Sequence, residues 1–243
     1  MADGADVFGL ALRDWARGGT DPEVLERDDG FTEIGAGHEL YVADVDHWLT
    51  AERRALRFVS GRVVDVGCGA GRVALHLQQR GHDVVGVDAS PLAVATAAAR
   101  GVAETWCMTV DALGTRIESF DTIVLYGNNF GIFATPLRLR RLLTSWARRT
   151  PPGARILAGS TNPYCGGAPG LTRAYYRANR RRGLPPGRVR LRLRYRHHVG
   201  PWFTWLFVSR REMAELLRGT GWYPSRILGG SPAEPYVAVL EKR

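Results

Sequence analysis

Short apolar runs alternate with amphipathic stretches between residues 60 and 160 of the chain. Apolar runs of about four to eight residues predict buried strands, and an apolar repeat of about three to four residues predicts the helices between them. Ser90 and Thr135, each followed by proline, are expected N-caps of two helices, and Gly81 and Gly101 are expected helix ends. The predicted strands are RVVDVG, HDVVGVD, ETWCMTVD, FDTIVLYG and GARILAGST. This alternation predicts a doubly wound, mostly parallel α/β sheet.

The pattern changes on both sides of this region. Residues 5–17 and 44–58 are expected to be helices, separated by a polar, turn-rich stretch. Beyond residue 160, RVRLRLRYRHHVGPWFTWLFVS predicts two strands joined around Gly200, and a helix from Ser209 and two final strands close a seven-stranded sheet. We expect one domain over residues 1–243. Its parts are an N-terminal helical lid (1–59), a core (60–160), a C-terminal β-hairpin insertion (161–208) and a closing helix with strands (209–243).

Composition narrows the class of protein. Of the 243 residues, 45% are hydrophobic and 23% are charged, as in an ordinary soluble domain. No window approaches about 18 uncharged apolar residues and no signal-peptide pattern is present, so we expect a cytoplasmic protein without a membrane partner. The scattered cysteines Cys68, Cys107 and Cys165 lack metal-site spacing and indicate free thiols and no metal. The net charge of +9 indicates either an anionic partner or a solvated arginine-rich surface.

A glycine cluster follows the first predicted strand of the core. Gly67, Gly69 and Gly71 have the spacing G-x-G-x-G, whereas a dinucleotide site has G-x-G-x-x-G, and Arg72 stands where its last glycine would be. A glycine turn at a helix N-terminus favours negative ligand groups. Asp65, two residues before the first glycine, would oppose a pyrophosphate there but attract an ammonium group. The glycines alone do not identify the ligand, so the prediction depends on the acidic residues nearby.

Acidic residues accompany the first three predicted strands of the core. Asp88, at the end of the second, is placed to accept hydrogen bonds from two ribose hydroxyls, and Asp111, just past the third, can receive the exocyclic amine of adenine. With Asp65, they predict a ligand that has adenosine, no phosphates and a positively charged tail. We therefore expect S-adenosyl-L-methionine (SAM), not NAD, as the cofactor and S-adenosyl-L-homocysteine (SAH) as the product.

In this combination the motifs resemble those of the class I SAM-dependent methyltransferases over residues 60–160, and the resemblance implies their Rossmann-like fold and their activity. The motifs are VVDVGCGAG, VVGVDAS, VDAL and FDTIVLYGNNFGIF. The implied cofactor site consists of Tyr41, Asp65, Gly67, Cys68, Gly69, Gly71, Asp88, Ala89, Asp111, Ala112, Tyr126, Gly127 and Asn128. The last three are expected beside the methionine part of SAM, and Ala89, Asp111 and Ala112 beside the adenine. ERDDGF and PWFTWLFVSRREMAELL resemble a loosely characterised bacterial branch of the family.

The loop after the fourth predicted strand bears on the acceptor. It reads GNNFGIF and lacks the Asn/Asp-Pro-Pro-aromatic cluster often carried by methyltransferases of nucleic-acid and protein nitrogens, which argues against nucleic acid. We expect methyl transfer to O or N of a small molecule, anionic or aromatic, in secondary metabolism, mainly by in-line positioning. Expected catalytic residues are His38, Asn129 and His198, and expected substrate contacts in the substrate-side insertion are Tyr164, Tyr195 and Trp202. Structural roles for the histidines and turn formation by the asparagines are the alternatives.

The segment RVRLRLRYR alternates arginine with apolar residues from Arg188 to Arg196, which is the period of a strand with one apolar and one charged face. The charged face indicates either a solvated edge strand or a clamp for a phosphate, a carboxylate or a carrier-protein helix. If the charged face is a clamp, a methyltransferase that acts on RNA or protein is the second functional hypothesis after the small-molecule methyltransferase. The third is a SAM-binding, non-methylating enzyme such as a cyclase. We expect a monomer or a homodimer.

Overall fold

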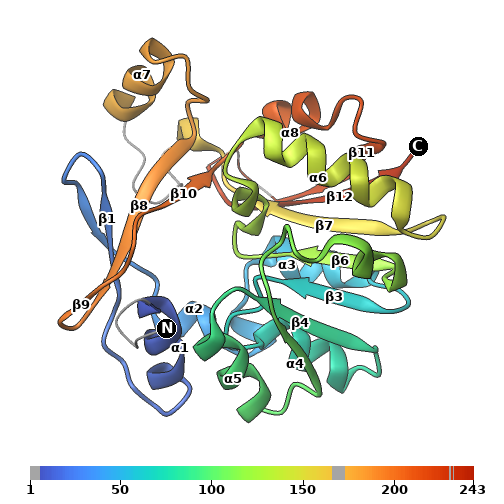
Figure 1. Ribbon diagram of the computed structural model, residues 1–243, viewed down its shortest axis with the longest axis horizontal. Coiled ribbons are helices and arrows are strands. Elements are labelled where there is room, and N and C mark those ends of the chain that lie inside the picture. The colour runs from blue at the N-terminus through green and yellow to red at the C-terminus, as the bar shows by residue number, and fades with distance from the viewer. Residues whose placement is uncertain (1–5, 166–172, 230, 232) are drawn as a thin grey trace. The chain divides into compact units, whose positions relative to one another are not determined.

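The computed structural model describes residues 6–165, 173–229, 231 and 233–243 (Figure 1). The chain divides into two compact units. Unit 1 comprises the residues up to Trp48, Val63–Ala112 and Arg190–Phe203, and unit 2 comprises Leu49–Arg62, Leu113–Val189 and Thr204–Arg243. Each unit is therefore assembled from three separate stretches of the chain.

Unit 1 combines parallel and antiparallel strands. Its elements are α1 (Val7–Trp15), β1 (Val24–Arg27), β2 (Thr32–Ile34), α2 (His38–Tyr41), the 3-10 helix η2 (Val45–His47), β3 (Val63–Val66), α4 (Arg72–Gln79), β4 (Val84–Asp88), α5 (Pro91–Ala99), β5 (Glu104–Cys107), most of β8 (Arg188–Tyr195) and β9 (His198–Val199). Strand β4 pairs in parallel with β3 and β5. Strand β1 pairs antiparallel with β2 and β8, and β8 pairs antiparallel with β9.

Unit 2 holds the remaining strands of the α/β core. Its elements are α3 (Thr50–Ala55), η3 (Leu56–Phe58), η4 (Gly114–Ser119), β6 (Thr122–Leu125), η5 (Asn129–Phe133), α6 (Pro136–Arg149), β7 (Arg155–Ser160), η6 (Pro163–Cys165), α7 (Arg173–Arg181), most of β10 (Phe203–Leu206), α8 (Arg210–Leu217), β11 (Trp222–Leu228) and β12 (Tyr236–Lys242). Strands β6 and β7 are parallel, and β12 runs antiparallel to both β7 and β11.

The strand order β11-β12-β7-β6-β3-β4-β5 gives a seven-stranded, mostly parallel sheet, so the predicted α/β fold class is confirmed. The other strands, β1, β2, β8, β9 and β10, belong to a second sheet. Among the described residues, no helix is long and apolar enough to cross a bilayer. The same residues contain no group of three or more His, Cys, Asp or Glu side chains able to hold a metal ion.

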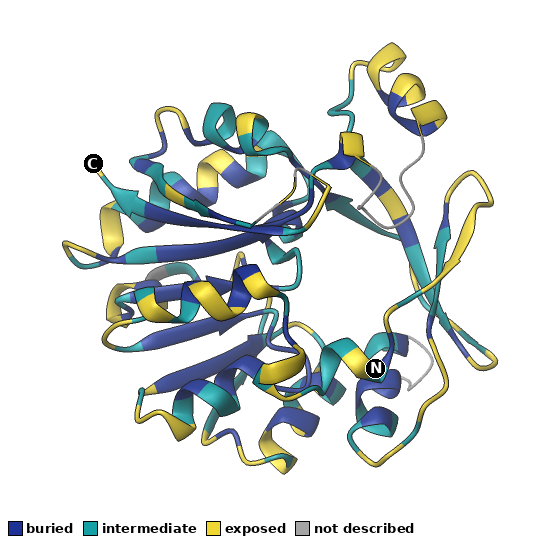
Figure 2. Cartoon of the chain, turned by 180° about the vertical axis from the view of Figure 1, so that it is seen from behind, coloured by how far each residue is buried: buried dark blue, intermediate teal, exposed yellow. Residues whose placement is uncertain are grey.

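Burial and capping explain why the core elements form where they do. All residues of β3 and of β6 are buried (dark blue in Figure 2), which accounts for their unbroken apolar character. The predicted helix starts are confirmed, since Ser90 Oγ accepts a hydrogen bond from Ala93 N at 2.9 Å and Thr135 Oγ1 accepts one from Arg138 N at 3.3 Å. At α8, Ser209 forms a capping box with the glutamate three residues later.

Two predictions for the N-terminal part are wrong. The stretch expected to be turns holds the β1–β2 hairpin, and the helix expected over residues 44–58 is divided into η2, α3 and η3. Strand β2 is exposed along its whole length, so it has no apolar periodicity, and β1 pairs with a strand far along the chain, with Val24 opposite Arg194. The helix is interrupted because Trp48 has an extended backbone, and its indole N–H donates to Ala43 O at 2.9 Å.

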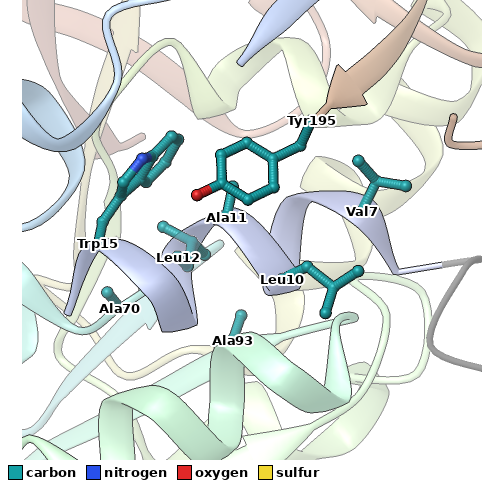
Figure 3. Close-up of a cluster of buried hydrophobic side chains, with 8 residues drawn as sticks. All are labelled: Val7, Leu10, Ala11, Leu12, Trp15, Ala70, Ala93 and Tyr195. Carbon is teal, nitrogen blue, oxygen red and sulfur yellow. The ribbon is translucent and has the colours of Figure 1, made fainter. Parts of the chain in front are cut away.

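Helix α1 lies in a cluster of buried apolar side chains within unit 1 (Figure 3). Figure 3 shows Tyr195, from β8, on one side of α1 and Ala93, from α5, on the other. Ala70, from the turn between β3 and α4, belongs to the same cluster. Trp15 of α1 also stacks on Tyr41 of α2, with ring centroids 5.6 Å apart. Helix α1 therefore places aromatic side chains beside the glycine turn.

Candidate functional site

The glycine turn joins β3 to α4 in unit 1. Gly67 donates its backbone N–H to Val87 O at 2.8 Å, which fixes the turn against the end of β4. Gly67, Gly69 and Gly71 have φ angles of 75°, 54° and 80°, in the left-handed region that favours glycine. A Cβ atom on Gly71 would also lie 2.7 Å from Val102 Cγ2. Backbone conformation and available space both require glycine at position 71.

Asp88 ends β4, and its carboxylate is bound to the glycine turn. Its Oδ2 accepts a hydrogen bond from Gly69 N at 3.0 Å, and its Oδ1 accepts one from Ser90 N at 2.9 Å. Burial raises the pKa of the Asp88 carboxyl, and the charge of nearby Asp6 adds to the increase, while the backbone hydrogen bonds oppose it. Each carboxylate oxygen keeps a lone pair for a further donor. The carboxylate can therefore fix the turn and accept two ligand hydroxyls at the same time.

Asp6 connects the N-terminal ends of α1 and α5. Its Oδ1 accepts a hydrogen bond from Gly9 N at 3.1 Å and caps α1. Its Oδ2 accepts hydrogen bonds from Ser90 Oγ at 2.7 Å and Leu92 N at 3.1 Å. Asp6 was not predicted as a site residue. An aspartate before an amphipathic helix is a recognisable N-cap, but its contact with Ser90 joins residues 84 positions apart.

Cys68 is a buried spacer in the turn. Its side chain is 6% exposed, and burial raises the pKa of its thiol, helped by the charges of Asp65 and Asp88. A Cβ atom on Gly86 would lie 3.1 Å from Cys68 Sγ, so the thiol occupies the space that this glycine leaves on β4. A neutral, buried thiol is a poor nucleophile. Asp65, also buried, lies in β3 with Gly86 as its partner in register.

The residues predicted to contact adenine lie at the surface of unit 1. Ala89, Asp111 and Ala112 are all exposed. Ala89 directly follows Asp88, and Ala112 N donates to Thr109 O at 3.0 Å in the loop after β5. Their contacts with adenine stay predictions.

In unit 2, helix α3 holds the loop that follows β6. The buried Tyr126 donates its hydroxyl hydrogen to Glu52 O at 3.1 Å, and Gly127 N donates to Glu52 Oε1 at 2.9 Å. Glu52 is 1% exposed, so this charge-assisted bond is shielded from water. Nothing in the segment TAERRA distinguishes a buried glutamate from an exposed one, and Glu52 was not predicted.

Asn128 has a left-handed backbone, with φ 66° and ψ 15°, a conformation in which asparagine is enriched. Its Oδ1 accepts a hydrogen bond from Thr161 Oγ1 at 2.7 Å, and its O accepts one from Trp205 Nε1 at 3.1 Å. The indole of Trp205 also occupies the space over Gly131, where any Cβ atom would overlap it. The turn role of Asn128 is confirmed, and its contact with the cofactor stays a prediction, as do those of Tyr126 and Gly127.

Three predicted residues of unit 1 lie on different segments. His38 begins α2 and is half-buried. His198 lies in β9, with its ring centroid 3.9 Å from that of His197. Trp202 has the guanidinium carbon of Arg192 4.6 Å from its ring centroid. The predicted catalytic roles of the two histidines and the predicted substrate contact of Trp202 stay predictions.

The other predicted residues include one that is fully packed. Tyr195 is 2% exposed in the cluster around α1, and its hydroxyl donates to Asp14 Oδ2 at 3.4 Å. In unit 2, Asn129 begins η5, and the hydroxyl of Tyr164 in η6 donates to Glu212. The hydrogen bond to Glu212 and burial raise the pKa of Tyr164 to about 12, with burial the larger cause. Catalysis by Asn129 and substrate contacts of the two tyrosines stay predictions.

Arginines of β8 form ion pairs within unit 1. Arg192 donates to both carboxylate oxygens of Glu26, at 2.9 and 2.6 Å, and Arg194 binds the same carboxylate. Arg196, just past β8, is paired with two aspartates, Asp14 at 2.9 Å and Asp21 at 2.7 Å. These pairs join β8 to β1 and to the end of α1. Much of the predicted charged face therefore forms ion pairs with carboxylates of the same unit.

The Glu26 pairs should be visible in the pH dependence of stability. Hydrogen bonds from Arg192 and Arg194 lower the pKa of Glu26 from 4.5 to about 2. A lowered folded-state pKa stabilises the protein above the ordinary pKa and loses that contribution as the pH falls toward the folded value. We expect Glu26→Gln to reduce the loss of stability between about pH 4.5 and pH 2, measured as urea midpoints. A matched change in an exposed ion pair with Arg149, Glu118→Gln, should leave that slope unchanged.

The comparisons with known proteins point to one family. Residues 63–153 match the family model described as a methyltransferase domain. A solved SAM-dependent methyltransferase from Bacteroides fragilis, in complex with SAH, has a TM-score of 0.79 at 23% identity, covering 100% of this chain and 97% of that chain. One from Methanosarcina mazei has a TM-score of 0.59 at 20% identity, covering 78% and 96%.

A curated relative matches over a much shorter segment. The 2-heptyl-1-hydroxyquinolin-4(1H)-one methyltransferase of Mycobacteroides abscessus is 53% identical over 36 residues, which are 15% of this chain and 16% of that protein. The region matched by the family model contains the glycine turn, Asp88 and the loop after β6. The solved structures have the same fold and include one with SAH bound. Residues 63–153 of this chain therefore match a methyltransferase domain, and the chain has the fold of solved SAM-dependent methyltransferases.

Proposed function

We propose that this protein transfers a methyl group from SAM to an oxygen or nitrogen atom of a small molecule. The observation that carries the proposal is the Asp88 carboxylate, which binds the glycine turn through Gly69 N and Ser90 N and still has acceptor capacity for two hydroxyls. A ribose presents two adjacent hydroxyls of this kind.

The residues of unit 1 fit SAM. The left-handed glycines allow a ligand to approach the backbone of the turn, because no Cβ atom intervenes. Asp88 would accept the ribose hydroxyls, and Asp65 would lie near the amino group. When bound, SAM supplies a methyl group on a positively charged sulfur atom. Alignment of the reactants accounts for much of the rate in such displacements, and the neutral thiol of Cys68 does not compete as a nucleophile.

The ion pairs of β8 support a small-molecule acceptor. Arg192, Arg194 and Arg196 are engaged by carboxylates of the same unit, which reduces the positive surface available to RNA phosphates. The curated relative with the 36-residue match is named for methylation of a small molecule, which supports the same class of acceptor. We extend the proposal to secondary metabolism in the cytoplasm. Support for the cytoplasm comes from Cys68, Cys107 and Cys165, which are free thiols.

Calorimetric titration of the purified chain with SAM, SAH and NAD tests the cofactor. We expect micromolar binding of SAM and SAH and no binding of NAD. Binding of NAD alone would contradict the proposal. Incubation with SAM carrying an isotope-labelled methyl group and a metabolite library should then yield a labelled small molecule. Label transferred to RNA or protein and to no small molecule would overturn the acceptor class.

A further inference from the structure

A buried glutamate of unit 1 has no part in the cofactor site. Glu23, just before β1, is 2% exposed, and its Oε2 accepts a hydrogen bond from Gly37 N at 3.0 Å. In the part of the chain that the structure describes, Glu23 forms no ion pair and accepts no hydrogen bond from another side chain. Burial raises the pKa of its carboxyl. A buried carboxylate without a cation opposes folding, so its presence points to a ligand that supplies the cation.

The strand register places Glu23 on the face of the antiparallel strands that packs against α1. Val24 is opposite Arg194, so the same register places Glu23 opposite Tyr195, and directly opposite residues share a face. Tyr195 is part of the cluster around α1. The backbone of Gly35 lies against the carboxylate so closely that a Cβ atom there would overlap Glu23 Oε1. The loop before α2 therefore packs directly against the carboxylate.

Three aromatic rings of unit 1, those of Phe8, Trp15 and Tyr41, form one group. Trp15 and Tyr41 stack with ring centroids 5.6 Å apart, and the ring centroids of Phe8 and Tyr41 are 5.0 Å apart with the two rings nearly perpendicular. Burial, and then the charge of Glu23, raise the pKa of Tyr41, while the charge of Arg72 lowers it, and the effect of Glu23 indicates that its carboxylate lies near Tyr41. Phe8 and Tyr41 are only half-buried, so this group of rings has an open side. The faces of aromatic rings attract cations, and a carboxylate beside them adds a formal charge to that attraction.

The aromatic group also adjoins the glycine turn. Helix α1, which carries Phe8 and Trp15, packs on the turn through Ala70. A Cβ atom on Gly69 would lie 3.6 Å from Leu12 Cδ1 of the same helix. The carboxylate, the rings and the turn therefore belong to one continuous part of unit 1.

We propose that Glu23, Trp15 and Tyr41 recognise an ammonium group carried by the methyl acceptor, so that the acceptor is a molecule with an amino group. The proposal rests on the proposed function and adds the class of substrate to it. The amino group of the cofactor is the other source of an ammonium. The family resemblance implies a cofactor contact for Tyr41. We assign the three residues to the acceptor instead, because all of them lie outside residues 63–153, the region matched by the methyltransferase-domain model, which contains the glycine turn and Asp88.

Two probes of the same shape test the inference on the complete chain. Benzylamine is a cation at pH 7, and benzyl alcohol is its neutral counterpart. We expect calorimetry on the SAH-saturated protein to give at least tenfold tighter binding of benzylamine. Glu23→Gln should abolish this preference, whereas Glu39→Gln, which changes an exposed glutamate of α2, should retain it.

Three outcomes would overturn the inference. The first is equal affinity of the two probes for the unmodified chain, which decides the matter even where Glu23→Gln does not fold. The second is a full benzylamine preference in Glu23→Gln. The third is a Glu23→Gln variant that loses affinity for SAH but binds 5′-methylthioadenosine normally. That nucleoside lacks the amino group of SAH, so this result would assign the site to the cofactor. Failure of the unmodified chain to bind SAH at all would refute the proposed function, and the comparison of the probes without SAH would still test the amine site.

Discussion

Asp88→Ala should weaken SAH binding at least tenfold. The substitution removes the acceptor proposed for two ribose hydroxyls, and hydrogen bonds to charged groups contribute about 1.5–3 kcal/mol each. It also releases Gly69 N and Ser90 N, which the carboxylate holds at 3.0 and 2.9 Å. Tenfold corresponds to about 1.4 kcal/mol, so the loss of one such bond is sufficient. Calorimetric titration with SAH measures the change in Kd directly.

Two control variants distinguish loss of the ribose acceptor from a general effect of changing a carboxylate at β4. Asp83→Asn changes a carboxylate just before the first residue of β4, at the opposite end of the strand from Asp88, and should leave SAH affinity unchanged. Asp88→Asn keeps one acceptor oxygen, so its SAH affinity should lie between those of the native chain and of Asp88→Ala. An Asp88→Ala protein that is folded by circular dichroism and binds SAH with native affinity would refute the ribose assignment.

The core of the fold could be predicted because its determinants are local. The apolar runs of β3 and β4 and the Ser90 cap act on residues within a few positions of themselves. The same holds for the glycine turn and Asp88, because the end of a predicted strand also fixes where its last side chain lies. The β1–β2 hairpin depends instead on a partner strand that begins at Arg188, and no local pattern announces that pairing.

Residues that support the site were missed for the same physical reason. Glu52 contacts Gly127 across 75 positions, and Asp6 contacts Ser90 across 84. Asp6 is recognisable only as a local N-cap and Glu52 as an ordinary helical glutamate, and only the tertiary structure brings their distant hydrogen-bond donors into contact. The arginine alternation along β8 correctly predicts a strand with two faces, but the sequence does not show whether the arginines face solvent or carboxylates. In the structure, Arg192 and Arg194 both pair with the carboxylate of Glu26.

Gly71→Ala should lower the free energy of unfolding by about 2–5 kcal/mol. Alanine at φ 80° carries the left-handed penalty of about 1–2 kcal/mol. Its Cβ would also lie 2.7 Å from Val102 Cγ2 and 3.1 Å from Ala97 Cβ, and crowding of this kind in a packed region costs about 1–3 kcal/mol. Ala97 is fully buried in α5, so relief of the overlap requires movement of the turn itself. Urea unfolding of the native and variant chains measures the difference.

Gly81→Ala is the matched control, because it isolates the overlap from the backbone strain. Gly81 follows the C-cap of α4 with φ 84°, close to that of Gly71, but a Cβ atom there would meet nothing within 4 Å. It should therefore lose only about 1–2 kcal/mol, and its SAH affinity should stay native. Gly71→Ala should bind SAH more weakly as well, since a displaced turn moves Gly69 N relative to Asp88. Equal stabilities of the two variants would show that α5 yields to the added methyl group, and that the turn is constrained by φ alone.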